Sequence, residues 1–391
     1  MRNLGRSRRV ALAVGMALAA AGCSSGSSNK PTTTSSLPPL PPLVYAYVTM
    51  VGAGNNIGIG HTVRPVDVSP GGAGAQPAIS VGTYPDAIAI APHGKTAYVT
   101  NYTSNSVSVI DLASGKTTIQ IPLGSSAGPA GIAITPDGTT AYVTDAGAPG
   151  TLGSTITPIS LAKNKVLPPI TVGSGPQGIA ITPNGARAYV ADAGSIVAGQ
   201  TGSVGNTVTP VDLATGKSLG PIVVGNAPTG VAITPDGSTA IVTNLNSGSV
   251  SPINIASNKA RAPISVQGGP IAVAVSPADP AIAWVADTSS NTSTGANVTP
   301  VDLSAGVAGT PIPIGKGPQG IAITPDGTTA WIVCYNASSL ESIDLRTKRP
   351  GPAVRVAGGP SAIALTTHPR AGTAATGGAG STSKATTTTK G

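Results

Sequence analysis

One thirteen-residue pattern recurs along the chain and constrains its fold more than any other feature. It reads PQGIAITPNGARA at residues 176–188 and PQGIAITPDGTTA at 318–330. A period in the forties that contains short strands is typical of β-propeller blades. Related copies, each with a proline, a short apolar run and, in most, a Pro-x-Gly-like turn, begin 42 to 52 residues apart, at Pro85, Pro129, Pro176, Pro228, Pro270, Pro318 and Pro360.

Each period contains four runs with the composition of β-strands. The first, GIAIT at 178–182, is apolar on both faces, as expected for a sheet that is covered on both sides. A TPDG-type turn leads to a second run such as AYVTD (141–145). The third and fourth runs resemble VSVIDL (107–112) and ITVG (170–173), so each repeat predicts one four-stranded antiparallel blade.

The two ends of the repeat region complete each other. Residues 45–50, 63–68 and 79–82 match the second, third and fourth runs without a first, whereas 360–365 matches a first run without successors. A ring closed by its own termini leaves no open sheet edge between its ends. We therefore predict an all-β, seven-bladed β-propeller whose last blade combines the N- and C-terminal segments.

The second run carries a resemblance to a known family. Tyr-Val-Thr-Asn at 98–101 and Tyr-Val-Thr-Asp at 142–145 resemble the YVTN β-propeller repeat, and the likeness extends over residues 44–367. The resemblance implies a seven-bladed propeller. Related bacterial propellers include lactonases, lyases, haem-binding domains and surface scaffolds, so the fold by itself implies little about activity.

Prolines interrupt the third run in five repeats. Proline is normally excluded from a strand that is paired on both sides, because it has no N–H to donate. We therefore expect a bulge or a local break in the third strand at Pro65, Pro158, Pro210, Pro252 and Pro300.

The N-terminal residues predict export. Residues 1–22 join four arginines to an apolar stretch and read as a signal peptide, and Ala-Ala-Gly-Cys at 20–23 resembles a bacterial lipobox with Cys23 as the acylated residue. The alternative is an ordinary secretory signal, and Ser7-Arg8-Arg9 leaves twin-arginine export open. Residues 23–43 then form a Ser/Thr/Pro-rich tether, and 368–391 a disordered Gly/Ser/Thr tail.

The net charge of +8 belongs to these ends and not to the propeller. Eight of the 22 basic residues lie outside 44–367, whereas all 14 acidic residues lie inside it. The predicted propeller is therefore neutral, with no basic face for nucleic acid.

Most titratable residues have a structural interpretation. Eleven of the 14 acidic residues recur at equivalent repeat positions, where aspartate accepts hydrogen bonds at turns. Off this pattern, Glu341 is expected on a solvated strand face. Cys334 is expected to be a small buried hydrophobe, with a reactive thiol as the alternative. The three histidines are not at ligand spacing, so we expect no metal and no cofactor.

One face of the ring is expected to carry any binding site. Four long connections between second and third strands (50–62, 146–155, 193–206 and 288–297) emerge there, although loop growth without function is the alternative. His61, Tyr84 and Asp86 converge on the same face beside the channel mouth. Equivalents of Asp86 extend a possible polar ring, which gives the candidate ligand set His61, Tyr84, Asp86, Gln177, Thr229 and Gln319.

These observations favour a monomeric, lipid-anchored propeller outside the bacterial cell membrane, acting as a non-enzymatic binding or scaffolding module. Its partners would be the membrane, through Cys23, and an envelope protein or small ligand on the long-loop face. Two alternatives stay open: a propeller enzyme of the lactonase or lyase kind with a site at the channel mouth, and a structural surface component.

Overall fold

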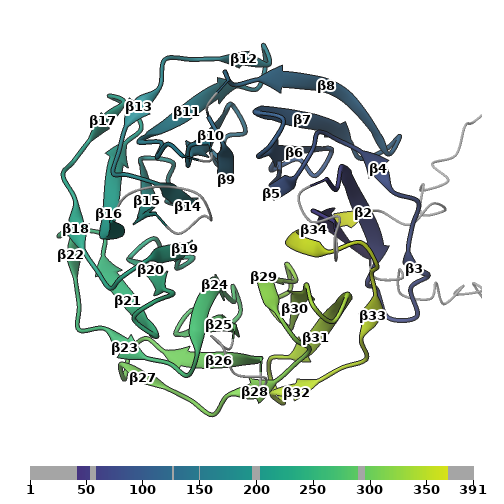
Figure 1. Ribbon diagram of the computed structural model, residues 1–391. Helices are drawn as coiled ribbons and strands as arrows, with labels where there is room; N and C mark the ends of the chain where they lie inside the picture. Colours follow the sequence, from purple (N-terminus) through teal and green to yellow (C-terminus); the bar gives the residue numbers. More distant parts are fainter. Residues whose placement is uncertain are drawn as a thin grey trace, which may run out of the picture. The chain divides into compact units, whose positions relative to one another are not determined.

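A computed structural model describes residues 42–52, 59–125, 127–148, 150–195, 203–288 and 296–368. Seven small antiparallel sheets are arranged around a central channel, as predicted (Figure 1). We name them blade 1 (β5–β8), blade 2 (β9–β13), blade 3 (β14–β18), blade 4 (β19–β23), blade 5 (β24–β28), blade 6 (β29–β33) and the shared blade (β34 with β1–β4).

The innermost strands line the channel, and each contacts the innermost strands of both neighbouring blades. They combine alanine and glycine with β-branched residues, because little space remains where seven sheets converge. The innermost strands are β5 (Pro85–Ile90), β9 (Pro129–Ile134), β14 (Pro176–Ile181), β19 (Pro228–Ile233), β24 (Gly269–Val275), β29 (Pro318–Ile323) and β34 (Pro360–His368).

The second and third strands form the buried middle of each blade. The second strands are β1 (Leu43–Met50), β6 (Thr96–Asn101), β10 (Thr140–Asp145), β15 (Arg187–Gly194), β20 (Thr239–Asn244), β25 (Ile282–Thr288) and β30 (Thr329–Cys334). The third strands are β2 (Thr62–Asp67), β7 (Ser106–Asp111), β11 (Thr155–Ser160), β16 (Val204–Asp212), β21 (Ser249–Asn254), β26 (Asn297–Asp302) and β31 (Ser339–Asp344).

The outer strand is continuous only in blade 1 among the described residues, as β8 (Lys116–Pro122). Elsewhere it is split into two short segments on either side of a stretch that is not in a strand. These segments are β3 (Gly74–Ala75) and β4 (Ile79–Ser80), β12 (Lys165–Val166) and β13 (Ile170–Thr171), β17 (Lys217–Ser218) and β18 (Ile222–Val223), β22 (Lys259–Ala260) and β23 (Ile264–Ser265), β27 (Val307–Ala308) and β28 (Ile312–Pro313), and β32 (Arg349–Pro350) and β33 (Val354–Arg355).

The prediction of a bulge or break in the third strand at its prolines was wrong, because the interruption lies in the outer strand instead. Pro158 stays in unbroken register with Tyr142 of β10, so the third strand itself has no bulge or break. The Pro158 carbonyl accepts a hydrogen bond from the amide of Leu167, which lies between β12 and β13, whereas the proline nitrogen has no hydrogen to donate. The lost donor therefore interrupts the outer strand, which has solvent beyond it, and spares the buried one.

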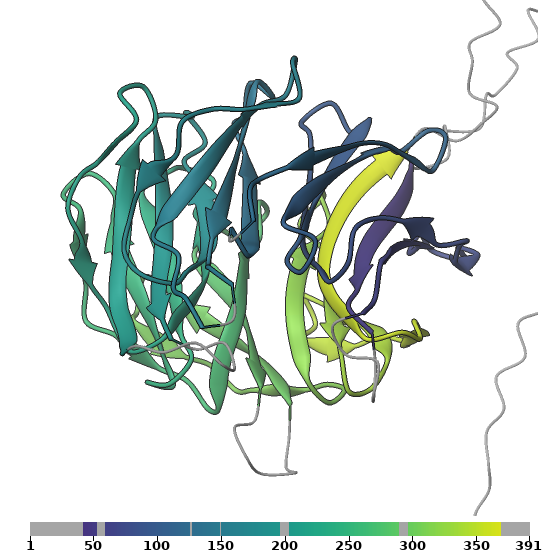
Figure 2. The ribbon, with the colours of Figure 1, turned by 45° about the horizontal axis from the view of Figure 1, so that its top comes forward.

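The ring closes through the two ends of the propeller region, as predicted. β1 pairs antiparallel with β34, from Leu43 opposite His368 to Met50 opposite Pro360. Figure 2 shows β34 beside β1, although they lie at opposite ends of the sequence. Within the described residues, no helix is long and apolar enough to cross a membrane.

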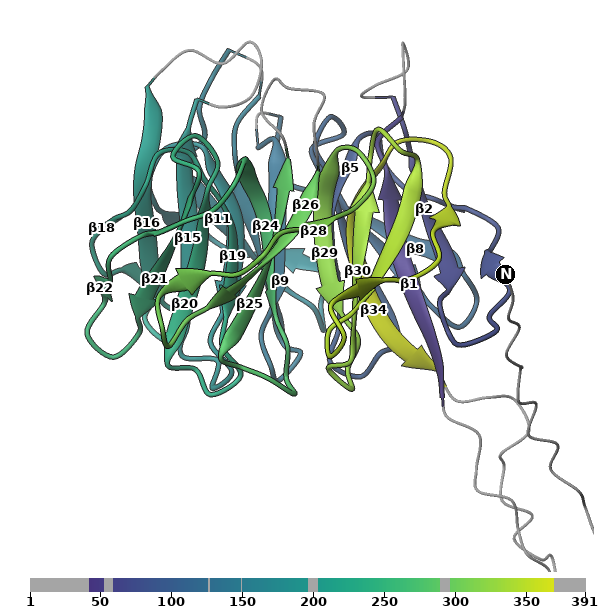
Figure 3. The same cartoon turned by 90° about the horizontal axis from the view of Figure 1, so that it is seen from below.

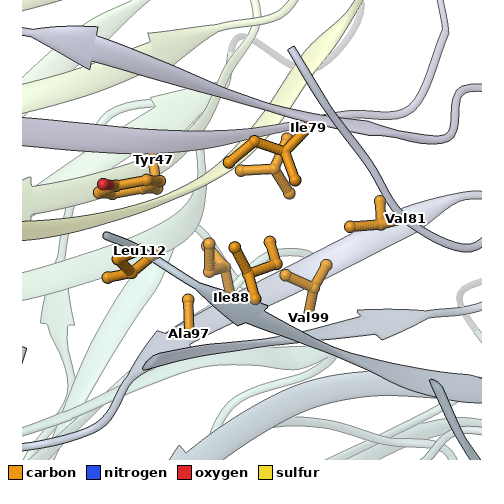
Figure 4. Packing of buried hydrophobic residues seen from close by; sticks show 9 residues of the cluster. Tyr47, Ile79, Val81, Ile88, Ala97, Val99 and Leu112 are labelled. Atoms are coloured by element: carbon orange, nitrogen blue, oxygen red, sulfur yellow. The ribbon is translucent and has the colours of Figure 1, made fainter. Parts of the chain in front are cut away.

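The hydrophobic core lies between blades rather than within any one of them. One cluster joins Tyr47, Val63 and Ile79 of the shared blade to Ile88 and Val99 of blade 1, all of them buried (Figure 4). Six further clusters fill the described interior in the same way. Each blade therefore needs both neighbours to bury its apolar faces.

The expectations for Cys334 and Glu341 had different outcomes. Cys334 is fully buried between apolar neighbours, as expected, and burial raises the pKa of its thiol to about 12. The expectation that Glu341 faces solvent was wrong. Its carboxylate accepts hydrogen bonds from the Gly315 amide at 2.8 Å and the Ser339 hydroxyl at 3.0 Å, so it ties blade 6 to the segment that enters it.

Candidate ligand site at the channel mouth

Connections from two parts of each blade meet at one end of the channel. The residue after a second strand donates its amide hydrogen to the segment that enters the innermost strand, as in Tyr102 to Tyr84 at 2.8 Å and Tyr335 to Gly317 at 2.7 Å. The strands run between the two ends of the ring (Figure 3), so the opposite end carries the TPDG-type turns. We call the first end the loop face.

Threonines of the YVTN-like motif hold adjacent blades together just below this face. Each innermost strand shifts register after its proline, as between Pro129 and Ile132 opposite β10. The Thr144 hydroxyl fills the gap: it accepts from the Gly131 amide at 2.7 Å and donates to the Gln177 carbonyl of blade 3 at 2.7 Å. Thr100 makes the equivalent bridge from blade 1 to Ala130 of blade 2.

The residue after each innermost-strand proline defines a ring of seven positions at the mouth. Asp86 is the only ionisable member of this set. Thr229 uses its hydroxyl for a bond to the Ile271 carbonyl of blade 5 at 3.1 Å, and the buried Nε2 of Gln177 has no hydrogen-bond partner within the described residues. The full set, which we call the mouth ring, is Asp86, Ala130, Gln177, Thr229, Ile271, Gln319 and Ser361.

A cavity of about 220 Å³ lies beside three successive members of the mouth ring. Gln319 and Ser361 line it, together with Tyr84, Tyr335 and Val51. Asp86 is the next member after Ser361, on the neighbouring innermost strand β5. The cavity therefore lies over the shared blade, between blades 6 and 1.

Tyr84 has a backbone conformation that side chains disfavour. Its φ is +55°, in the left-handed region, whereas the equivalent residues Gly128, Gly175, Gly317 and Gly359 are glycines with positive φ. Holding a residue with a Cβ in this region costs about 1 kcal/mol. Only Ala227 among the other six equivalents also has a side chain there. This strain places an aromatic ring at the mouth where the repeat otherwise uses glycine or, in blade 4, alanine.

Two further tyrosines lie close to Tyr84. The ring of Tyr102 is tilted by 56° against that of Tyr84, with the centroids 5.6 Å apart. The Tyr102 hydroxyl donates to the Gly147 carbonyl at 2.9 Å, and the Tyr335 hydroxyl donates to the Gly52 carbonyl at 3.0 Å. Each of these hydrogen bonds reaches the next blade and fixes the position of its ring.

The Asp86 carboxyl is desolvated although the residue is only half-buried. Part of its surface is accessible, but protein atoms surround the group closely, and this burial raises its pKa to about 6. The pKa of Tyr84 rises to about 12, first through burial, then through the negative charge of Asp86, and least through Tyr335 and Tyr102, which become negative only when they ionise at high pH. Asp86 and the three tyrosines therefore form one electrostatic cluster, which we call the tyrosine–Asp86 cluster.

His61 lies near this cluster only through its backbone. The preceding residue, Gly60, accepts a hydrogen bond from the Tyr84 amide at 2.7 Å. The imidazole itself is exposed, with Nδ1 3.3 Å from the Ile59 carbonyl oxygen of its own loop. In the part of the chain that the structure describes, it makes no hydrogen bond to Asp86.

Of the candidate residues, the structure brings together Tyr84, Asp86 and Gln319, and leaves Gln177 and Thr229 farther around the ring. Sequence reasoning missed Tyr102 and Tyr335. Both occupy the first position after a second strand that is followed by a short turn, a repeated position that could have indicated them. Cys23 lies outside the described residues.

Comparisons with known proteins agree on architecture. No protein-family model matches the sequence, and no curated protein matches it either. Among solved structures, hydrazine synthase from Kuenenia stuttgartiensis is similar over 73% of this chain and 96% of its own, with 21% identity and a TM-score of 0.61. A functionally unknown protein from Desulfotomaculum acetoxidans covers 83% of this chain and 99% of its own, with 18% identity and a TM-score of 0.65. At these identities the likeness shows the β-propeller fold alone.

Proposed function

We propose that this β-propeller is a binding module whose ligand occupies the channel mouth on the loop face. Tyr84 is the observation that carries the proposal. A tyrosine in a backbone conformation that the repeat otherwise gives mainly to glycine destabilises the fold, so its side chain has to contribute something else. That side chain lines the cavity together with Gln319, and the Asp86 carboxyl acts on it electrostatically.

The surroundings of the cavity favour binding over catalysis. Its described lining carries no formal charge, and the Asp86 carboxyl, which is not part of the lining, acts electrostatically on Tyr84. Acid–base catalysis needs groups with matched pKa values in mutual contact, and the exposed His61 imidazole makes no such contact with Asp86 in the described structure. Desolvated polar groups beside an aromatic ring instead match the composition of a ligand pocket.

Paired substitutions on the two ends of the ring test the location of the site. A fragment library is screened by NMR against the wild-type protein and two double variants. We expect the double variant Asp86→Ala with Gln319→Ala to lower the affinity for the bound fragments at least tenfold. Asp137→Ala with Asp236→Ala, in the TPDG-type turns, should cost stability and leave fragment affinity unchanged. Fragments that respond only to the second pair would contradict the proposal, and Asp86-dependent hydrolysis of a lactone panel would support an enzyme instead.

We propose further that the protein is exported and anchored to the outer face of the bacterial cell membrane through an acylated Cys23. One lipid-modified cysteine followed by the 23–43 tether would hold the propeller near the membrane. Cys23→Ala should move the protein from the detergent-extracted fraction to the soluble fraction. Cys334→Ala, which removes the other cysteine, is the matched control and should leave fractionation unchanged. Membrane association that survives Cys23→Ala would require another anchor.

A further inference from the structure

The charge of the mouth ring indicates the class of ligand, provided that the proposed site is correct. Asp86 carries the only formal charge among the seven ring positions. Neither an ion pair nor a hydrogen bond to its carboxylate occurs within the described residues, and burial is the one cause of its raised pKa. A carboxylate that is desolvated without a partner is unfavourable, and a bound positive charge would relieve this cost.

The aromatic rings beside Asp86 also favour a positively charged ligand. The faces of tyrosine rings are electron-rich and attract cations within about 6 Å of the ring centroid. Tyr84 and Tyr335 line the cavity, and the negative charge of Asp86 acts on both Tyr84 and Tyr102. The hydrogen bonds to Gly52 and Gly147 hold two of these rings in place without a ligand.

Other ligand classes fit these groups less well. The unpaired negative charge of Asp86 would repel an anion, and a neutral apolar ligand would leave the carboxylate desolvated and unpaired. A bare metal ion needs several ionised or carbonyl ligands, whereas the described residues contain no group of three acidic, histidine or cysteine side chains that could hold one. Burial also keeps the Tyr84 phenol protonated, which makes it a poor metal ligand.

We infer that the tyrosine–Asp86 cluster binds a small organic cation, with the ammonium group between Asp86 and the rings of Tyr84 and Tyr335. Gln319 and Ser361, which also line the cavity, would accept or donate hydrogen bonds to a polar substituent of the ligand. The class comprises amines and quaternary ammonium compounds small enough for a cavity of about 220 Å³.

A pair of probes with the same shape separates charge from size. Choline and its neutral isostere 3,3-dimethyl-1-butanol are titrated into the protein at pH 8 and followed by NMR. We expect choline to bind at least tenfold more tightly than the alcohol. Asp86→Asn should remove most of this difference, whereas Asp137→Asn, on the opposite end of the ring, should preserve it. Choline affinity should also fall as the pH is lowered through about 6, because protonation neutralises Asp86.

Two further variants isolate the aromatic contribution. Tyr84→Gly removes the ring from its left-handed position, and Ala227→Gly makes the same backbone change in blade 4 without removing a ring. The first variant should lower the affinity for choline at least fivefold, and the second should leave that affinity unchanged.

Each contrary result has a defined meaning. Equal affinities for choline and the alcohol, or choline binding that is insensitive to Asp86→Asn, would overturn the cation inference and leave the proposed binding site standing. Failure of both probes, while library fragments still bind in an Asp86- and Gln319-dependent manner, would also overturn the inference alone. If no fragment depends on those residues, the proposed function itself fails.

Discussion

At the scale of single residues, the asparagine or aspartate that ends the YVTN-like motif in blades 1 to 5 organises buried polar contacts within its blade. In blade 1, Asn101 Nδ2 donates to the hydroxyls of Ser106 and Ser108. In blade 2, Asp145 instead accepts from the hydroxyls of Thr155 and Thr157. The repeated aspartates at this position therefore serve mainly side-chain networks inside the blade. Those in the TPDG-type turns and at the ends of the third strands accept backbone hydrogen bonds at turns, as expected.

Asp287 of blade 5 provides a test with a defined pH dependence. Its side chain is 1% exposed, its Oδ1 has no hydrogen-bond partner within the described residues, and burial raises its pKa to about 7. The unfolded value is about 3.9. Between these values the folded state retains a proton that the unfolded state has lost, so stability declines as the pH rises through this window. Asp287→Asn should remove the decline and stabilise the protein at pH 8 by up to about 4 kcal/mol in urea unfolding.

Asp302 of the same blade is the control with the opposite sign. Its exposed carboxylate accepts hydrogen bonds from the amides of Ser304 and Ala305, which lower its pKa. Asp302→Asn should therefore reduce stability at neutral pH, and the reduction should disappear in acid. If Asp287→Asn destabilised the protein equally at pH 4 and pH 8, the burial argument would be wrong.

At the scale of elements, the third strand decides the form of its outer neighbour. Tyr98 pairs with Val109 in blade 1 as Tyr142 pairs with Pro158 in blade 2. Val109 retains its N–H, and β8 is a single strand with one register shift beside Val109, whereas the five blades with proline at this position have split outer strands. Blade 6 has Ser342 there and is still split, but its outer segment contains Pro350 and Pro352.

Val109→Pro should convert blade 1 to the split form. The substitution removes one hydrogen bond to β8, and we expect a loss of about 1 kcal/mol in unfolding free energy, since the same residue type fits five equivalent positions. Hydrogen exchange should show faster exchange for the β8 amides and unchanged protection in β6. Protection lost throughout β5, β6 and β7 would contradict the conclusion that the outer strand alone absorbs the change.

At the scale of the whole propeller, closure depends on two strands from opposite ends of the sequence. β34 supplies the innermost strand of the shared blade and contacts the innermost strands of blades 1 and 6. Ala362 and Thr49 add a cross-strand bond, from the amide of the first to the hydroxyl of the second, at 2.8 Å. Removing β34 would uncover β1 and the cores on both of its sides.

A truncation after Gly359 should therefore destabilise the entire ring rather than one blade. Urea unfolding should shift to a markedly lower midpoint for the tryptophan signals of Trp284 and Trp331, which lie in blades 5 and 6. A truncation after His368 retains β34 and should behave like the full chain. An unchanged midpoint after the first truncation would show that the other six blades are stable without closure.

The sequence alone determined the architecture, because repeats, turn residues and strand order are local patterns. The number of blades, the closure of the shared blade and the common face of the long loops all follow from it. Only the tertiary structure decided which side chains meet. Tyr84 and Tyr102 flank strands of blade 1, whereas Tyr335 follows β30 of blade 6, so the three rings converge only once the ring of blades has closed. Asp86 acquires its raised pKa from burial that no repeat position reveals. Glu341 was misjudged for the same reason, because its partner Gly315 belongs to the linker between two blades.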